Sequence, residues 1–257
     1  MNFGACTIIL LLFVFPSCAD KNSTLQWYEN FEGPELDENI WNYDLGDGCP
    51  NLCGWGNQEL QYYRPSNVSL DDNQLVITAE KEGGTYYSGK ITTKNKFEFQ
   101  YGTIEVRAKL PSGTGTWPAI WMLGSDINDI GWPACGEIDI MEYVGKNPGV
   151  VHTSLHTSSS SGNTENTAIH SIEDPENTFH IYGCTWNANE IVFSIDGHEV
   201  YRYAPETKDL NTWPFDKPFF VILNLAIGGT FGGPDIDDDA LPAKFTIDYI
   251  KVSSNNP

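Results

Sequence analysis

Three acidic residues stand close together in an otherwise apolar stretch that reads GEIDIMEYVG, namely Glu137, Asp139 and Glu142. Side chains two residues apart in a β-strand share a face, which places Glu137 beside Asp139. Glu142 lies five residues from Glu137, an odd offset that would turn it to the other face. A β-bulge near Ile140 and Met141 would insert one residue and return Glu142 to the face of the other two acids.

Three interpretations of this group of carboxylates are possible: catalysis, cation binding, and no functional site. Crowded carboxylates push each other's pKa values apart, and this supplies the ionised and the protonated carboxyl that acid/base or nucleophilic catalysis needs. Carboxylate oxygens also bind hard cations. In the third interpretation no bulge forms, and Glu142 simply faces solvent. The spacing alone leaves all three open.

The acidic strand must belong to a sheet, because strand patterns dominate the rest of the chain. Residues 103–110 read TIEVRAKL, in which apolar and polar side chains alternate as in a strand with one buried face. Similar short runs cover residues 74–80, 136–144, 150–157, 178–186, 190–197 and 245–252. Residues 217–229 are nearly continuously apolar, which is typical of a central strand covered on both faces, and Asp196-Gly197 is a hairpin signal. The pattern predicts a single all-β sandwich or barrel.

The composition of the 257 residues limits the function further. The chain has 14 Lys+Arg against 35 Asp+Glu, a formal charge of −21, which argues against an electrostatic grip on nucleic acid. Charged residues are only 19% and hydrophobic residues 40%, so the chain is not a disordered acidic segment. Its 8 Trp residues suit either core packing or stacking on flat apolar faces such as sugar rings.

The first residues of the chain predict export. Residues 7–16 read TIILLLFVFP, an apolar run of signal-peptide length that is too short to span a membrane as a stable helix. Ser17 and Cys18 follow, as in a bacterial lipoprotein signal, so residues 1–18 are interpreted as a signal peptide with Cys18 lipidated; an ordinary secretory signal is the alternative. Both interpretations predict an exported protein, either secreted or held at the outer membrane or cell surface through a lipid anchor.

Export changes how the cysteines are interpreted, because disulfides persist in oxidising compartments. Cys49 and Cys53 stand close enough for a small disulfide loop, and zinc is the rival interpretation of such a pair. Cys135 and Cys184 either pair with each other or remain buried thiols.

The order of several motifs resembles glycoside hydrolase family 16, in particular its endo-β-1,3-glucanase (laminarinase) branch. The motifs are GWGNQELQYYR (54–64), GTIEVRAKLPSGTGTWPAIWML (102–123), WPACGEIDIMEYVG (132–145), FHIYGCTW (179–186) and WPFDKPFFVILNLAIGG (213–229). The resemblance implies one catalytic domain over residues 19–257. Its expected fold is a jelly-roll β-sandwich of two antiparallel sheets with a concave glycan-binding cleft.

The resemblance also implies a reaction, the retaining hydrolysis of internal β-1,3 bonds in laminarin-like glucans. In it Glu137 is the nucleophile, Glu142 the general acid/base and Asp139 an assisting carboxylate, because a retaining glycosidase needs two neighbouring carboxyls in different protonation states. The alternatives are a mixed-linkage β-1,3/1,4-glucanase, a galactan hydrolase of the same family and a non-catalytic β-glucan-binding protein.

Further residues receive roles by the same resemblance. The expected substrate contacts are Asn57, Arg107, Trp117, Trp121, Trp132 and His156. The alternatives are core packing for the tryptophans, a salt-bridged surface position for Arg107 and a structural role for His156. A structural calcium ion is expected at the Asp248 side chain with main-chain oxygens of Asn30 and Asn73. No catalytic cofactor is expected, the partner is a β-glucan polysaccharide, and the protein is expected to be a monomer.

Overall fold

Alternating burial identifies the strands of the computed structural model, which describes residues 23–254. In β9 (Gly102–Lys109) buried and partly exposed side chains alternate at every position, as the sequence pattern predicts. In β17 (Phe219–Ile227) every residue is buried, which confirms it as a central strand. Asp196 and Gly197 form a two-residue turn with positive φ angles of 51° and 77° between β15 (Ile191–Ile195) and β16 (His198–Tyr203), which confirms the predicted hairpin.

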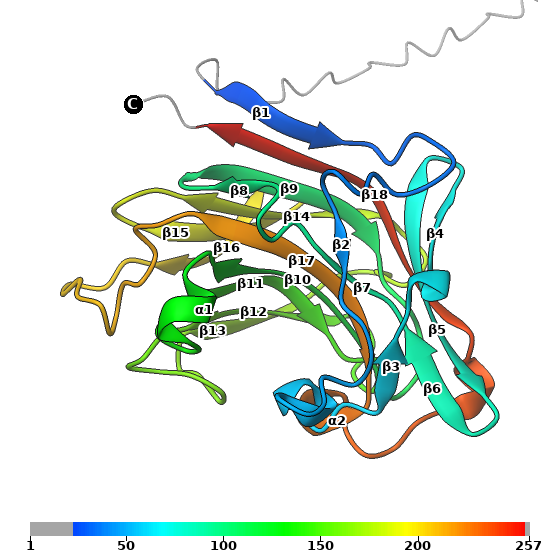
Figure 1. Ribbon diagram of the computed structural model, residues 1–257. Coiled ribbons are helices and arrows are strands. Elements are labelled where there is room, and N and C mark those ends of the chain that lie inside the picture. Colours follow the sequence, from blue (N-terminus) through cyan, green and yellow to red (C-terminus); the bar gives the residue numbers. More distant parts are fainter. Residues whose placement is uncertain (1–22, 255–257) are drawn as a thin grey trace, which may run out of the picture.

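The strands form two sheets that face each other (Figure 1). The ten-stranded sheet has the order β16, β15, β14 (His180–Trp186), β9, β18 (Ala243–Ser254), β5 (Gln74–Glu82), β6 (Thr85–Ser88) and β3 (Gln61–Tyr63), with β1 (Thr24–Glu29) beside β18 and β4 (Val68–Asp71) beside β5. The eight-stranded sheet has the order β13 (Thr167–Ser171), β12 (Val150–His156), β11 (Glu137–Tyr143), β10 (Thr116–Gly124), β17, β7 (Lys90–Thr92) and β2 (Asn42–Tyr43), with β8 (Glu98–Phe99) beside β17.

Most neighbouring strands run antiparallel, whereas β3 and β6 are parallel. Of two short helices, α1 (Ile127–Ile130) lies between β10 and β11 of the eight-stranded sheet, and α2 (Gly229–Gly232) lies in the connection from β17 to β18 of the other sheet. Three 3-10 turns cover η1 (Cys53–Gly56), η2 (Pro65–Asn67) and η3 (Asp238–Ala240). The arrangement is a jelly-roll β-sandwich, which confirms the expected fold class.

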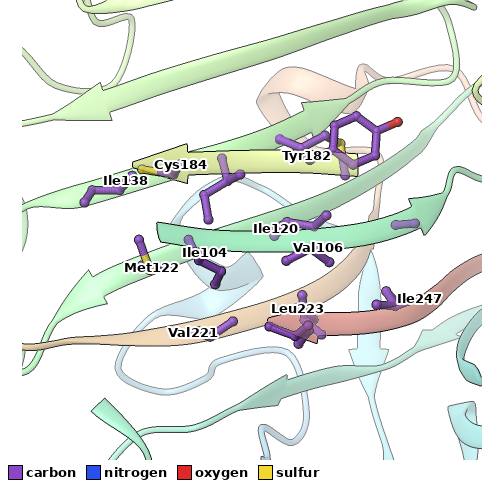
Figure 2. Close-up of a cluster of buried hydrophobic side chains, with 14 of the residues drawn as sticks. Ile104, Val106, Ile120, Met122, Ile138, Tyr182, Cys184, Val221, Leu223 and Ile247 are labelled. Atoms are coloured by element: carbon purple, nitrogen blue, oxygen red, sulfur yellow. The ribbon is translucent and has the colours of Figure 1, made fainter. Parts of the chain in front are cut away.

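The core lies between the two sheets and draws its side chains from both (Figure 2). In Figure 2, Val106 of β9 and Tyr182 of β14 come from the ten-stranded sheet, while Ile120 of β10, Ile138 of β11 and Leu223 of β17 come from the eight-stranded sheet. All five are at most 1% exposed. Residues on the opposite face of each strand therefore point out of the sandwich, which gives each sheet one outer face.

The structure decides between the two interpretations given for each pair of cysteines. Cys49 and Cys53 form a disulfide, which confirms the small loop. Cys135 and Cys184 are separate buried thiols. Cys18 and the predicted signal peptide lie outside the described residues. Among residues 23–254, neither helix is long and apolar enough to cross a membrane.

Candidate active site

The predicted β-bulge is present in β11. Asp139 pairs with Ser154 of β12 and Glu142 pairs with His152, so three steps along β11 match two steps along β12. The two residues between the acids are both buried in the core. Glu142 therefore returns to the face that carries Glu137 and Asp139. We call this outer face of the eight-stranded sheet the carboxylate face.

Two indole groups hold the outer carboxylates in place. Nε1 of Trp132 donates a 2.8 Å hydrogen bond to Oε2 of Glu137, and Nε1 of Trp117 donates a 3.0 Å hydrogen bond to Oε1 of Glu142. Trp132 is 48% exposed, whereas Trp117 is only 9% exposed and packs edge-to-face against Phe231. Each indole N–H stabilises the ionised form of its carboxylate. Both tryptophans lie at the carboxylates, and their contact with substrate stays a prediction.

His156 completes the group from the neighbouring strand. It pairs with Glu137 across β11 and β12, and its Nε2 lies 3.0 Å from Oδ2 of Asp139 and 3.7 Å from Oε1 of Glu137. The ring of Trp132 covers it at a centroid distance of 5.9 Å. The imidazole is thus in contact with two of the three acids, and its side chain is 11% exposed.

The three carboxyls all resist ionisation. Burial raises the pKa of Glu137 well above its usual range, and the charge of Asp139 raises it further, while His156 lowers it. Burial and the charge of Glu142 raise the pKa of Asp139. Burial also raises the pKa of Glu142, against the hydrogen bond from Trp117. Three crowded, desolvated carboxyls cannot all be ionised at once, so the site holds a proton at a pH where isolated carboxyls have lost theirs.

A chain of hydrogen bonds links Trp121 and Asn57 along the same face. Nε1 of Trp121 donates to Oδ1 of Asn224 at 2.7 Å, and Nδ2 of Asn224 donates to the hydroxyl of Tyr63 at 3.1 Å. The Tyr63 hydroxyl donates to Oε2 of Glu59 at 3.2 Å, and Nδ2 of Asn57 donates to Oε1 of Glu59 at 3.3 Å. Trp121 itself pairs with Asp139 on the catalytic strand. The network therefore runs from the loop of Asn57 to Trp121, the strand neighbour of Asp139.

Sequence reasoning missed Glu59, Tyr63, Asn224 and Lys90. The Nζ atom of Lys90 lies 4.0 Å from the ring centre of Trp55, 5.2 Å from that of Trp121 and 3.2 Å from Oδ2 of Asp44. Burial raises the pKa of Glu59. Two signals were available: residues 57–63 read NQELQYY, in which Leu60 is the one aliphatic residue, and Asn224 is an isolated polar residue within an apolar strand.

The prediction that Arg107 contacts substrate is wrong. Arg107 lies on β9, in the ten-stranded sheet, at a position whose neighbours in the strand point into the core. It faces outward on the side of the sandwich opposite the carboxylate face, and its Nη1 donates to Oδ2 of Asp248 on β18 at 2.6 Å. Alternation identifies the polar face of a strand but not the sheet to which the strand belongs. Arg107 is instead the salt-bridged surface residue of the alternative interpretation.

The same ion pair bears on the predicted calcium site. Asp248 is the only charged member of the predicted ligands, the others being main-chain oxygens of Asn30 and Asn73. Arg107 neutralises its Oδ2, and Gln74 donates to its Oδ1 at 3.4 Å. In this arrangement the residues do not fit a calcium ion, which would have to displace the guanidinium group. The calcium site stays a prediction.

Comparison with known proteins identifies the family to which this chain belongs. Residues 56–251 match the family model for glycosyl hydrolases family 16. A β-glucanase of Rhodothermus marinus is 41% identical over 89% of this chain and 84% of its own length. The crystal structure of a laminarinase from a Flavobacterium species shares 55% identity with a TM-score of 0.88, covering 89% of this chain and 99% of that chain. The laminarinase catalytic domain of Thermotoga maritima shares 37% identity with a TM-score of 0.86, covering 92% and 100%. With its acidic motif on one sheet face and a family match across most of its length, the chain belongs to glycosyl hydrolases family 16.

Proposed function

We propose that the protein is a retaining endo-β-1,3-glucanase that hydrolyses internal bonds of laminarin-like β-glucans. The observation that carries the proposal is the bulge of β11, which gathers Glu137, Asp139 and Glu142 on one face. The likeness to a β-glucanase and to laminarinases over most of the chain supports the choice of substrate.

The two outer acids divide the chemistry between them. Ionised Glu137 attacks the anomeric carbon of the sugar, and protonated Glu142 gives its proton to the leaving oxygen. Glu142 then takes a proton from water, which hydrolyses the covalent glycosyl-enzyme. Trp132 donates to Oε2 of Glu137, which favours the ionised nucleophile and leaves the other oxygen without that contact.

Asp139 and His156 set the protonation of the nucleophile. Asp139 lies between the two outer acids, and its charge raises the pKa of Glu137. The imidazole of His156 approaches both Asp139 and Glu137 and opposes that effect. In this proposal a proton moves between Glu137 and Asp139 as substrate enters, so that Glu137 is ionised when the leaving group departs.

The aromatic residues of the same face suit a neutral sugar. Trp132 is half exposed beside the nucleophile, and Trp121 is partly exposed beside Lys90. Indole faces stack on the apolar faces of sugar rings. A neutral glucan needs no complementary charge, so the formal charge of −21 does not oppose binding. We assign Asn57 to the same binding face through its hydrogen bond to Glu59.

The proposal is tested by incubating the purified protein with laminarin, lichenan, agarose and carrageenan and sizing the products. We expect short oligosaccharides to appear early from laminarin, with β-configured ends in the proton NMR spectrum. Products of α-configuration would contradict a retaining mechanism. Faster cleavage of lichenan, or cleavage of agarose or carrageenan, would favour the alternative glycanases, and binding without cleavage would favour a glucan-binding protein.

The roles of the two glutamates are separable with azide. In Glu142→Ala, assayed on an aryl β-glucoside whose phenolate departs without protonation, azide attacks the glycosyl-enzyme without needing a general base, so it restores turnover and yields a β-glycosyl azide. In Glu137→Ala, azide replaces the missing nucleophile and yields an α-glycosyl azide. The opposite pattern of products would exchange the two assignments.

We also propose that residues 1–18 direct export and that Cys18 carries a lipid, with residues 19–257 as one catalytic domain acting as a monomer. The support is the apolar run that ends before Ser17 and Cys18. Labelling with a radioactive fatty acid in the native host is expected to be lost in Cys18→Ser. Equal labelling of that variant would contradict lipidation, and release of the unlabelled protein to the medium would indicate an ordinary secretory signal.

A further inference from the structure

Three potential ligand atoms converge at the proposed nucleophile. Atoms of Glu137, Asp139 and His156 all lie within 4.8 Å of one another. We propose that this cluster is a binding site for a divalent transition metal ion of the Zn²⁺ type, and that the bound metal excludes substrate. The binding itself does not depend on the glucanase activity, whereas the inhibition rests on the proposed function.

The spacing of the atoms fits the coordination of zinc. Bonds from Zn²⁺ to imidazole nitrogen and carboxylate oxygen are about 2.0–2.2 Å long, so two ligand atoms at a tetrahedral ion stand roughly 3.3–3.6 Å apart. Nε2 of His156 lies 3.0 Å from Oδ2 of Asp139 and 3.7 Å from Oε1 of Glu137. Small side-chain movements would equalise these distances. Calcium and magnesium prefer six or more oxygen ligands, so the imidazole favours a transition metal.

A second observation points to a ligand at this position. Oδ2 of Asp139 is buried and accepts no well-aligned hydrogen bond among the described residues, although Nε2 of His156 lies 3.0 Å away, and the Asp139 side chain is only 4% exposed. A buried acceptor of this kind is costly unless something pairs with it. Glu137 is held by Trp132 through Oε2, so its Oε1 is the oxygen that faces His156. The three atoms therefore converge on one point, where a cation would replace their contacts with one another.

The surroundings of His156 limit the affinity. A histidine that binds zinc usually donates its other ring N–H to an oxygen, and loss of that partner costs 10–100-fold in affinity. Nδ1 of His156 is buried without a hydrogen-bond partner in the described part of the chain. We therefore expect a micromolar rather than a nanomolar dissociation constant. Such a site is inhibitory when metal is abundant and empties when metal is scarce.

The metal and the sugar compete for the same atoms. Oε1 of Glu137 is the oxygen left free to attack, and in the metal complex it becomes a ligand. The cation also neutralises Asp139, which removes the charge that sets the protonation of the nucleophile. Inhibition is therefore expected to raise the apparent KM for glucan while kcat at saturating glucan stays unchanged.

Other histidines provide matched controls. His170, His180 and His198 line a separate pocket of about 580 Å³ between β13 and the β15–β16 hairpin. Both ring nitrogens of His180 are engaged, Nδ1 by Asp196 at 2.7 Å and Nε2 by the carbonyl of Glu173 at 3.0 Å. Exposed His198 lies on β16 at the edge of the ten-stranded sheet, so His198→Gln removes an imidazole that is not part of the proposed site.

Isothermal titration calorimetry with zinc chloride tests the site directly. We expect one ion per chain in the wild type and in His198→Gln, with at least tenfold weaker binding in His156→Gln and Asp139→Asn. A saturating β-1,3-gluco-oligosaccharide is expected to weaken zinc binding to the wild type. Melting temperatures measured without metal confirm that each variant is folded.

Three results would overturn the proposal. They are absence of zinc binding by the wild type at millimolar concentration, unchanged affinity in both His156→Gln and Asp139→Asn, and loss of affinity in His198→Gln alone. If zinc binds as expected but the wild type cleaves no glucan, the metal site stands and the proposed glucanase function fails. If glucan is cleaved and zinc does not bind, the reverse holds.

Discussion

Nε1 of Trp117 lies 3.0 Å from Oε1 of Glu142 and donates to it a hydrogen bond that lowers the pKa of this carboxyl. Burial acts in the opposite direction and is the larger effect. The protonation of the proposed acid/base thus depends on a balance between desolvation and one indole N–H. This balance can be changed by a single substitution.

In Trp117→Phe we expect the alkaline limb of the kcat–pH profile to move upward by about one pH unit. Loss of the hydrogen bond leaves burial unopposed, so the pKa of Glu142 rises and the acid stays protonated to higher pH. We also expect kcat to fall roughly tenfold, because the carboxyl is no longer held in position. Trp121→Phe is the control, since its indole donates to Asn224 instead. A downward shift, or equal shifts in both variants, would contradict this role.

Asp139→Asn should change how stability depends on pH. The folded-state pKa values of Glu137 and Asp139 are raised, by burial first and then by neighbouring charges. Between the ordinary carboxyl pKa of about 4 and the raised values, the folded protein keeps a proton that the unfolded chain has lost, so stability falls as pH rises. The Asp139→Asn variant lacks one of these carboxyls, so its stability falls less than that of the wild type as pH rises. Its melting temperature relative to wild type should therefore increase from pH 4 to pH 7, by about 2–4 °C for each kcal/mol.

Glu82→Gln provides a control of opposite sign for this experiment. A hydrogen bond from Arg64 lowers the pKa of Glu82, so its contribution to stability is present at neutral pH and is lost as pH falls through the lowered pKa. The melting temperature of this variant relative to wild type should decrease slightly from pH 4 to pH 7. Parallel curves for Asp139→Asn and wild type would show that the carboxyl cluster does not titrate as described.

Glu59→Gln should destabilise the fold without touching the acids. Oε2 of Glu59 accepts hydrogen bonds from Nε2 of Gln61 at 2.7 Å and from the Tyr63 hydroxyl at 3.2 Å. A glutamine turns one acceptor oxygen into a donor, which leaves a donor of the network unpaired at a cost of about 1–3 kcal/mol. Thermal denaturation of Glu59→Gln, Tyr63→Phe and the double variant tests this. Simple additivity of the two effects would argue against a shared network.

Arg107→Gln should increase the response of the protein to calcium. With the guanidinium removed, Asp248 regains a net charge at the predicted calcium site, whose other expected ligands are main-chain oxygens of Asn30 and Asn73. A ligand that binds only the folded state raises the melting temperature, so the difference between calcium and chelator should be larger in the variant than in wild type. Lys251→Gln removes a neighbouring cation that pairs with Glu105 at 2.9 Å and serves as the control. Equal differences in all three proteins would remove the calcium site from consideration.

The strands and the acidic group could be predicted because the signal lies within single strands. The odd offset of Glu142 raises the possibility of the bulge, and the nearly continuous apolar run of β17 predicts its central position. Both features depend on alternation alone, which is read along the chain without any knowledge of its neighbours.

The errors and omissions arise from contacts between distant segments. The polar face of β9 correctly places Arg107 on a surface, but only the strand order shows that this surface belongs to the other sheet. Tyr63 and Asn224 are 161 residues apart in sequence and meet in one hydrogen bond. No local pattern contains such a pairing, although the largely polar stretch at residues 57–63 marks one of its two sides.

Because of the bulge in β11, the number of residues between two acids does not by itself decide whether both face the same side of the sheet. The two residues of the bulge, Ile140 and Met141, both point into the core, and Met141 is fully buried. Deleting Met141 would place Glu142 four residues from Glu137, an even offset, so its carboxylate would still face outward in a regular strand. What such a shortened chain would lose is a buried side chain between the sheets. The core must therefore have room for the extra side chain when Met141 is present. The acids face outward both with Met141 and without it.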